Sequence, residues 1–473
     1  MNRKQNNDDI DFVDWNAVWA KEELYRENKD SFDEAYKIAM QAKKTPKKQP
    51  STDQDKKPIK KKSVSKNAVK KTKTSKVNKT HSKRKKKKKK RWSWVKRIVF
   101  LILVFVNLYI IAIYSNIPFI AKWRTIYIET AMSTMTYQWL ATSFIPGDVI
   151  DAVMRDRYLL DESQSGLVSR WEGGIGFSPK SIWESDRDYF ERIFYEIDFD
   201  SFDEYAEKHN VYKKNGSVFI DEADLDGEGT TIETIYGDQV LALDEENGIL
   251  ILKIRGDGFV ARLAIIKDPS QVKLGVCDNF GTKGSRAELI TENNGAILGI
   301  NASGFVDPNG TGNGGKAYGL VLSEGKMYQE PIGNSNKTIA FDYRDRLNIG
   351  TYKSLDIFRD AVEFKPALII NGERLVNGSA GWGIQPRSVI GQTAKGEVLL
   401  LIVDGRAPGY SIGATLGQCT EIMSTYNAVQ ACNLDGGSSS IMYYNGREIS
   451  RPSAANKVKG RAIPNGFLVY PRK

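Results

Sequence analysis

The residues with the clearest chemical potential follow an apolar run near the C-terminus. There Asn433 and Asp435 precede two glycines, Gly436 and Gly437, and three serines at 438–440. Glycines let backbone N–H groups approach an anion closely, and serine hydroxyls add donors. The pattern predicts a carboxylate, Asp435, beside an anion-binding turn. A tight turn with a solvated Asp435 is the plainer interpretation, and three consecutive serines argue against it.

Further polar residues stand at the ends of apolar runs upstream. Arg387 opens a predicted hairpin that returns through Val398–Val403 to Asp404 and Arg406. The planar fork of arginine suits a phosphate, and Asp404 is a second candidate carboxylate. Asn301 ends a buried-looking strand, where it could hold a substrate hydroxyl or cap its own turn. Taken alone, Asn301 is better explained as a cap.

Histidine is almost absent, which limits the chemistry that the chain can perform. The sequence has two histidines and three cysteines, and no pair of cysteines has CxxC spacing. A His-rich zinc site is excluded, and a Ser-His-Asp triad could use only His209. Proton transfer must therefore rest mainly on carboxylates. We expect no metal and no other cofactor, because the aspartates named above do not have the spacing of a calcium loop.

A glycine-rich stretch at 310–317 imitates a nucleotide-binding loop. It is one residue short of that motif, and Ala317 replaces the Ser or Thr whose hydroxyl binds Mg²⁺. A strand-like run follows at 318–322, where a helix would be required. We reject nucleotide binding and expect either a loop that lines a cleft or a plain mobile loop.

Charge is distributed unevenly along the 473 residues. Residues 1–97 hold 32 Lys and Arg against 12 Asp and Glu, a net charge of +20, so the remaining residues carry −9 of the total +11. Residues 1–40 are acidic and contain a plausible short amphipathic helix. Residues 41–97 are Lys-rich without apolar periodicity, which predicts a disordered tract.

An uncharged stretch from Ile98 to Ala121 follows this basic tract. Its 24 residues are long and apolar enough for a transmembrane helix over 98–121. A signal peptide is less favoured so far into the chain. The positive-inside rule predicts that residues 1–97 are cytoplasmic and 122–473 extracellular. We therefore expect the basic residues at 83–97 to contact anionic lipid, and we expect no nucleic-acid partner.

The rest of the chain reads as an accessory region and a sheet-dominated α+β domain. Residues 122–247 start with a predicted amphipathic helix, whose apolar positions run from Ile128 to Leu140 and which should end at Pro146. Helical patterns and acidic loops follow it. Residues 248–473 contain β-branched runs and one clear helix near Leu416–Tyr426. Strands are predicted at 249–254, 259–266, 272–276, 296–300 and 466–470, and hairpin turns at 323–325, 343–345, 371–372, 395–396 and 445–446.

Six short blocks in this domain together resemble the phosphodiester glycosidase family. They are INASGF at 300–305, PRSVIG at 386–391, DGR at 404–406, GATL at 413–416, NLDGGSSS at 433–440 and RAIPNGF at 461–467. The resemblance spans roughly Gly248 to Pro471 and implies an α+β fold, an extracytoplasmic site and hydrolysis of a sugar-1-phosphodiester. Two positions depart from the family pattern: Gln418 stands where relatives often have Glu, and Ser438 where many have a third Gly.

The resemblance also supplies the candidate site residues. The catalytic candidates are Asp435, Asp404 and Arg387. The substrate-binding candidates are Asn301, Ser303, Gly304, Arg406, Asn433, Gly436, Gly437, Ser438 and Asn465.

These observations predict a single-pass membrane protein whose extracellular domain hydrolyses a glycosyl-1-phosphodiester of a cell-wall polymer or exopolysaccharide. Arg387 and Arg406 would neutralise the developing charge, and either Asp435 or Asp404 would act as the base or stabilise a cationic sugar. Attack at carbon and attack at phosphorus both remain open. The alternative is a non-catalytic surface protein that binds anionic glycopolymers during wall or exopolysaccharide assembly. The sequence predicts no oligomeric state.

Overall fold

The computed structural model describes residues 82–473, apart from 173–174, 210, 212–216, 226, 334 and 454–458. Side chains are described from residue 94 onward, apart from those gaps and residue 309. The chain divides into two compact units, Met1–Lys85 and Lys86–Lys473, and the fold below belongs to the second. The predicted acidic segment at 1–40 and most of the Lys-rich tract lie outside the described residues.

The first described helix, α2, runs from Ser82 to Tyr114. Its segment Trp94–Tyr114 has a mean hydropathy of 2.4 and is, within the described residues, the one helix whose length and composition suit a membrane span. The expected span 98–121 therefore extends past the helix end. Residues 82–97, expected to be disordered, are helical, because lysine and arginine are good helix formers and the apolar segment extends the same helix.

Three short helices follow α2, where the sequence pattern predicted one. They are α3 (Pro118–Met132), α4 (Trp139–Thr142) and α5 (Gly147–Ser163), and they share a small apolar core with Ile113. The predicted helix over 128–140 is broken after Met132. Thr134 explains the break: its Oγ1 donates to Ala131 O (2.9 Å) and accepts from Tyr137 N (3.1 Å), which replaces helical bonding.

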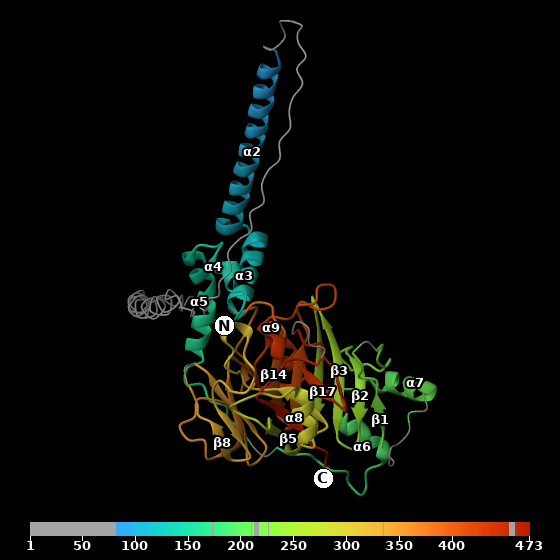
Figure 1. Cartoon of the computed structure of the whole chain (residues 1–473). Helices are drawn as coiled ribbons and strands as arrows, with labels where there is room; N and C mark the ends of the chain where they lie inside the picture. Colours follow the sequence, from blue (N-terminus) through green and yellow to red (C-terminus); the bar gives the residue numbers. More distant parts are fainter. Residues whose placement is uncertain are drawn as a thin grey trace, which may run out of the picture. The chain divides into compact units, whose positions relative to one another are not determined.

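The centre of the protein is a nine-stranded sheet in which every neighbouring pair is antiparallel (Figure 1). Its order is β1-β2-β3-β4-β15-β14-β16-β12-β13. The strands are β1 (Phe219–Asp221), β2 (Gln239–Asp244), β3 (Ile249–Gly256), β4 (Phe259–Ile266), β12 (Ala367–Ile370), β13 (Glu373–Arg374), β14 (Arg387–Thr393), β15 (Val398–Val403) and β16 (Ala428–Asn433).

Two five-stranded antiparallel sheets pack on one face of this large sheet. The first has the order β10-β9-β11-β7-β8 and the second β18-β17-β6-β19-β5. The strands of the first are β7 (Val321–Ser323), β8 (Lys326–Gln329), β9 (Lys337–Asp342), β10 (Leu347–Gly350) and β11 (Phe358–Phe364). Those of the second are β5 (Val272–Val276), β6 (Leu298–Asn301), β17 (Met442–Tyr444), β18 (Arg447–Glu448) and β19 (Asn465–Val469).

Strand alternation builds the two main cores. Leu399 and Leu401 of β15 face a core that also holds α6 (Asp186–Ile193), α7 (Phe199–His209) and α9 (Leu416–Thr425). Leu400 and Ile402 face the two smaller sheets. The large sheet is therefore buried on both faces, which explains why β15 is apolar throughout and why every residue of β4 is buried. A further helix, α8 (Ala287–Asn293), covers the sheet that contains β6.

The sheet-dominated α+β character is confirmed, as are the predicted hairpins. Each of the five expected turns joins two paired strands, and the non-glycine turn residues Glu324, Asp345, Asn371 and Asn445 have positive φ. Strands β1 and β2 precede residue 248 yet belong to the large sheet. The division of the chain at residue 248 stays a prediction.

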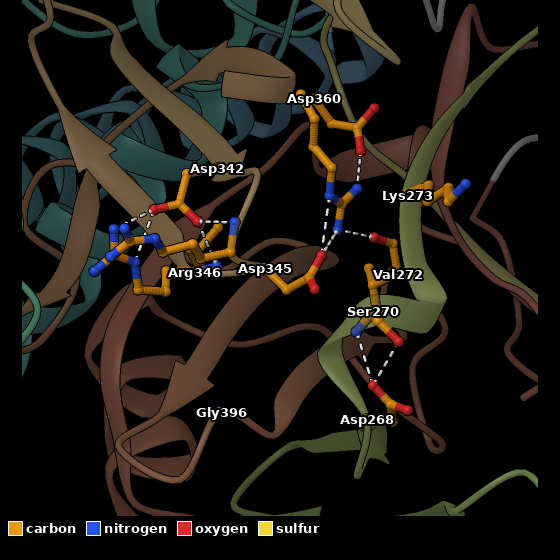
Figure 2. A network of polar contacts seen from close by, with 12 residues as sticks. Asp268, Ser270, Val272, Lys273, Asp342, Asp345, Arg346, Asp360 and Gly396 are labelled. Atoms are coloured by element: carbon orange, nitrogen blue, oxygen red, sulfur yellow. Dashed lines mark hydrogen bonds and ion pairs between the residues drawn. The ribbon is translucent and has the colours of Figure 1, made fainter. Parts of the chain in front are cut away.

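Ion pairs tie the layers together at two places. Arg359 donates to Val272 O (2.7 Å) and Asp345 Oδ1 (2.9 Å) and pairs with Asp360, linking two sheets (Figure 2). The buried Lys267 Nζ donates to Glu196 (2.6 Å) and Glu397 (3.0 Å), which fixes the α6–α7 region to β4 and β15. The region before residue 248 therefore contributes to the main fold.

Candidate active site

The end of β6 is joined to the segment after β16 through one asparagine. Asn301 is buried, and its Nδ2 donates to Asp435 O (2.6 Å). Its Oδ1 accepts from Ser388 Oγ (2.8 Å) and Ile441 N (3.2 Å). Asp435 N in turn donates to Ala302 O (3.2 Å). Asn301 therefore fixes the backbone at Asp435, so the turn cap expected for Asn301 alone is not its main contact.

The carboxyl of Asp435 has a strongly perturbed pKa. Burial raises this pKa to about 7, while a hydrogen bond with Ser439 and the charge of Arg461 act to lower it and Asp307 adds to the rise. The ordinary value for an aspartate is about 3.9. Asp435 still keeps some exposed surface. Its carboxyl can therefore gain and lose a proton near neutral pH, as a general acid or base must.

Arg406 places its guanidinium beside Gly437, the second glycine after Asp435. A Cβ added to Gly437 would lie 3.1 Å from Arg406 Nη2, so the two groups are in contact. The same Nη2 donates to Gln385 Oε1 (2.8 Å). Although Arg406 has exposed surface, partial burial lowers its pKa and nearby Tyr137 acts to raise it. The exposed fork leaves donors available for an anion.

A second guanidinium, that of Arg461, contacts the same segment at Ser438. Arg461 Nη1 donates to Ser438 Oγ (3.2 Å) and to Asp307 Oδ2 (2.7 Å). Burial alone would raise the pKa of Asp307, but Arg461 and the Gly312 N–H outweigh it and lower the pKa. Arg461 thus holds the glycine-rich loop to the site, since its Nη2 also donates to Gly312 O (3.3 Å).

Asp404 occupies an enclosed environment filled by donors. Its Oδ2 accepts from Arg262 Nη1 (3.1 Å) and Tyr410 Oη (2.8 Å), and its Oδ1 accepts from Arg451 N (2.8 Å). Its pKa is raised, chiefly by burial, with Arg262 acting in the opposite direction. Because three donors hold this carboxylate in place, it suits a structural ion pair better than proton transfer.

Arg387 is also buried, and main-chain carbonyls use most of its fork. Its Nη2 donates to Trp382 O and Gly383 O (2.8 Å each), and its Nε donates to Ala414 O (3.2 Å). Burial lowers its pKa to about 10. Nη1 takes part in none of these bonds. The expected contact between Arg387 and a phosphate stays a prediction, and the structure gives this side chain a clear role in holding the loop before β14.

Three predicted binding residues carry buried polar atoms that lack partners within the described residues. Asn465 Oδ1 accepts from Ser303 N (3.0 Å), whereas Asn465 Nδ2, Ser303 Oγ and Asn433 Oδ1 have no partner there. Buried polar atoms are nearly always paired, so these three are free to bind a ligand or water. Asn433 Nδ2 donates to Lys365 O (2.9 Å), and Gly304 O accepts from Tyr318 N (2.9 Å).

The turn after Asp435 is less open than the sequence predicted. Gly437 has φ +64, in the left-handed region, and its N–H donates to Pro386 O (2.9 Å). That N–H is therefore unavailable to an anion. Gly436 approaches the same Pro386 O, which would lie 2.8 Å from an added Cβ. The glycines serve close packing at this place, and the arginines supply the positive charge.

Gln418 caps α9. Its Oε1 accepts from Thr415 N (2.9 Å), and its own N donates to Thr415 Oγ1 (3.2 Å), which completes a capping box. Glutamate makes the same box, so the glutamine found here preserves the helix start. Within the described part of the chain, no group of three His, Cys, Asp or Glu residues could hold a metal ion. Independence from metal stays a prediction.

Sequence reasoning missed four residues that the fold brings to this site. Arg461 lies in the RAIPNGF block, in which only Asn465 was predicted to bind substrate. Asp307 follows the INASGF block by two residues, and Gln385 directly precedes PRSVIG. Ser439 lies in the serine run of the NLDGGSSS block. All four residues lie in a block or within two residues of one, and that position is the signal that could have identified them.

Comparisons with known proteins agree with the six blocks. The family model described as phosphodiester glycosidase matches residues 294–470, a range that contains all six. No curated protein matches the chain. Among solved structures, the catalytic domain of zebrafish N-acetylglucosamine-1-phosphodiester alpha-N-acetylglucosaminidase, auto-inhibited by its pro-peptide, is similar at 20% identity and a TM-score of 0.40, covering 47% of this chain and 82% of that chain.

Two further structures are similar at lower scores. A hypothetical protein from Synechocystis has 16% identity and a TM-score of 0.37 over 51% of this chain and 65% of that chain. A putative exported protein from Burkholderia pseudomallei has 15% identity and a TM-score of 0.35 over 45% and 74%. The assignment rests on the family model and on the blocks within its range. Over residues 294–470, the chain is therefore similar to the phosphodiester glycosidase family.

Proposed function

We propose that the chain is a membrane-anchored hydrolase that cleaves a glycosyl-1-phosphodiester outside the cytoplasm. One observation carries the proposal: in a phosphodiester glycosidase domain, two guanidinium groups lie beside the residues that follow Asp435. Arg406 touches Gly437, and Arg461 bonds Ser438. A carboxyl that titrates near neutral pH, beside fixed positive charge, suits the hydrolysis of an anionic ester.

In the proposed reaction, water replaces the phosphate at the anomeric carbon. The carbon–oxygen bond to phosphate breaks, and the products are a free sugar and a phosphomonoester. Phosphate is a good leaving group, so little general-acid catalysis is needed. Arg406 neutralises the charge of the departing phosphate. Ionised Asp435 takes the proton from water or stabilises the cationic sugar. Asp404 and Arg387 support the loops around them.

Anchoring through α2 is proposed on its length, its hydropathy and the surface next to its end. Large aromatic side chains are exposed on α3, on α4 and in the turn after α4: Phe119, Trp123, Trp139 and Phe144. Aromatic residues are enriched at membrane interfaces. The +20 charge of residues 1–97 favours a cytoplasmic N-terminus and anionic lipid contact at 83–97. With the domain outside, the proposed substrate is a wall polymer or exopolysaccharide.

Protease protection tests the orientation. Protease added to intact, wall-stripped cells should digest the C-terminal domain and spare an N-terminal tag. Digestion of the tag with survival of the domain would reverse the proposed topology.

Turnover tests the function itself. Full-length protein in detergent is incubated with a panel of sugar-1-phosphate methyl diesters, and release of reducing sugar is measured beside binding by calorimetry. We expect release from at least one diester, and loss of that release in Asp435→Asn. Binding without release by the unchanged protein would favour the non-catalytic alternative.

A further inference from the structure

We propose that α3, which lies outside the glycosidase domain, is part of the active site and positions Arg406 through Gln385. Thr130 is then a positioning residue for phosphate binding, and the α3–α4 turn (Ser133–Gln138) forms one wall of the site. The inference rests on the proposed function, because it assigns Arg406 to the substrate phosphate.

The first observation is the close contact between α3 and the loop before β14. Thr130 Oγ1 accepts from Ile384 N (3.1 Å), and Glu129 Oε1 accepts from Gly381 N (3.1 Å). Gly383 has φ +58, and a Cβ there would lie 2.5 Å from Thr130 N. The helix and the loop therefore meet backbone to backbone, and Gly383 permits that approach.

The second observation is that one buried amide joins α3 to Arg406. Gln385 Nε2 donates to Thr130 O (3.0 Å), and Gln385 Oε1 accepts from Arg406 Nη2 (2.8 Å). The Gln385 backbone is held by two bonds to Ala414 (3.1 and 2.9 Å). With its backbone fixed and its amide N–H directed at α3, Gln385 must present its oxygen to the guanidinium.

The third observation places the α3–α4 turn beside the same site. A Cβ on Gly310, at the start of the glycine-rich loop, would lie 2.5 Å from Thr136 Oγ1. Tyr137, the next residue, lies close enough to Arg406 to act on its charge. Asp307, near the start of that loop, binds Arg461. The turn therefore lies against the glycine-rich loop and near Arg406.

The position of α3 is itself fixed to the end of α2. Arg124 Nη1 donates to Ile113 O (2.7 Å) and Ser115 O (3.0 Å). Tyr109 Oη of α2 donates to Phe144 O (2.7 Å). Thr130 lies 12 residues into α3, about 18 Å along a helix that rises 1.5 Å per residue. The site thus lies near the outer end of the apolar helix and depends on residues that the family model does not cover.

A double-mutant cycle in the full-length protein tests the link. Thr130→Val removes the acceptor for Ile384 N while keeping the side-chain shape, and Gln385→Leu removes both amide bonds. A neutral hydrogen bond contributes about 0.5–1.5 kcal/mol, so Thr130→Val should lower kcat/KM by about two- to tenfold and Gln385→Leu by more. Thr130→Ser should restore the rate. Thr142→Val, an exposed threonine of the same helices, is the matched control.

The decisive readout is coupling to Arg406. In an Arg406→Ala background, Thr130→Val and Gln385→Leu should have no further effect on kcat/KM, because their only route to the substrate has been removed. Full additivity, or unchanged kinetics in the single variants, would overturn the inference while leaving the proposed function intact. If the unchanged protein releases no sugar, the proposed function fails, and the same cycle is read on the calorimetric Kd for a diester. Absence of coupling there would also overturn it.

Discussion

Gly437→Ala perturbs the contact between Arg406 and the turn after Asp435. Gly437 has φ +64, and a left-handed backbone costs an alanine about 1–2 kcal/mol. The new Cβ would stand 3.1 Å from Arg406 Nη2, so the guanidinium must give way by a few tenths of an ångström. A charge-assisted hydrogen bond from Arg406 to the substrate phosphate is worth about 1.5–3 kcal/mol, so its complete loss would lower kcat/KM about ten- to a hundredfold. The displaced guanidinium of Gly437→Ala should lower kcat/KM by up to that factor.

The backbone strain needs a control that leaves the site alone. Gly372 has φ +81 and nothing within 4 Å of an added Cβ, so Gly372→Ala carries comparable strain without a neighbour. Thermal unfolding and steady-state kinetics are measured for both variants. Both should melt at lower temperature, and Gly437→Ala alone should lose turnover. Equal kinetics in the two variants would refute the placement of Arg406 beside the substrate.

Three other variants test neighbouring parts of the account. For the unchanged protein, kcat/KM should rise with pH through about 7, whereas Asp435→Asn should be about a hundred- to ten-thousandfold slower without that step. Burial raises the folded-state pKa of Asp435 above its unfolded value, so the folding stability of the unchanged protein should fall as the pH rises from about 4 to 7. Asn cannot ionise, so Asp435→Asn should melt at a higher temperature than the unchanged protein at pH 8, and this difference should vanish toward pH 4. Arg262→Met leaves Asp404 buried without its ion-pair partner and should cost about 3–5 kcal/mol in denaturant unfolding; an unchanged midpoint would contradict the structural role of Asp404. Gln418→Glu keeps the capping box and should change neither melting nor turnover appreciably, and a large gain in turnover would show that a carboxylate is needed there.

Local patterns predicted the strands and hairpins well because they depend on nearby residues. The turns at Asn371-Gly372 and Asn445-Gly446 contain residues that tolerate positive φ, and both have it in the structure. The continuous apolar run of β15 likewise predicted a strand, and burial on both faces of the sheet accounts for that run. The break after Met132 was missed because the Thr134 hydroxyl bonds the backbone only in one particular conformation.

The site was harder to predict because its contacts join distant parts of the chain. Asp435 and Asn301 stood in recognisable blocks, and the fold brings them together. Nothing near Arg387 in sequence shows that the carbonyl of Ala414, 27 residues later, accepts from its Nε. The link from Thr130 to Gln385 spans 255 residues. No local periodicity contains that information.

The most direct test of the central claim is hydrolysis of a sugar-1-phosphate methyl diester in water enriched in ¹⁸O. We expect the heavy oxygen in the released sugar and none in methyl phosphate, because water attacks the anomeric carbon and the carbon–oxygen bond breaks. Asp435→Asn, shown to be folded by its melting temperature, should release both products about a hundred- to ten-thousandfold more slowly. Heavy oxygen in the methyl phosphate, or release at the full rate by Asp435→Asn, would contradict the proposed glycosidase mechanism.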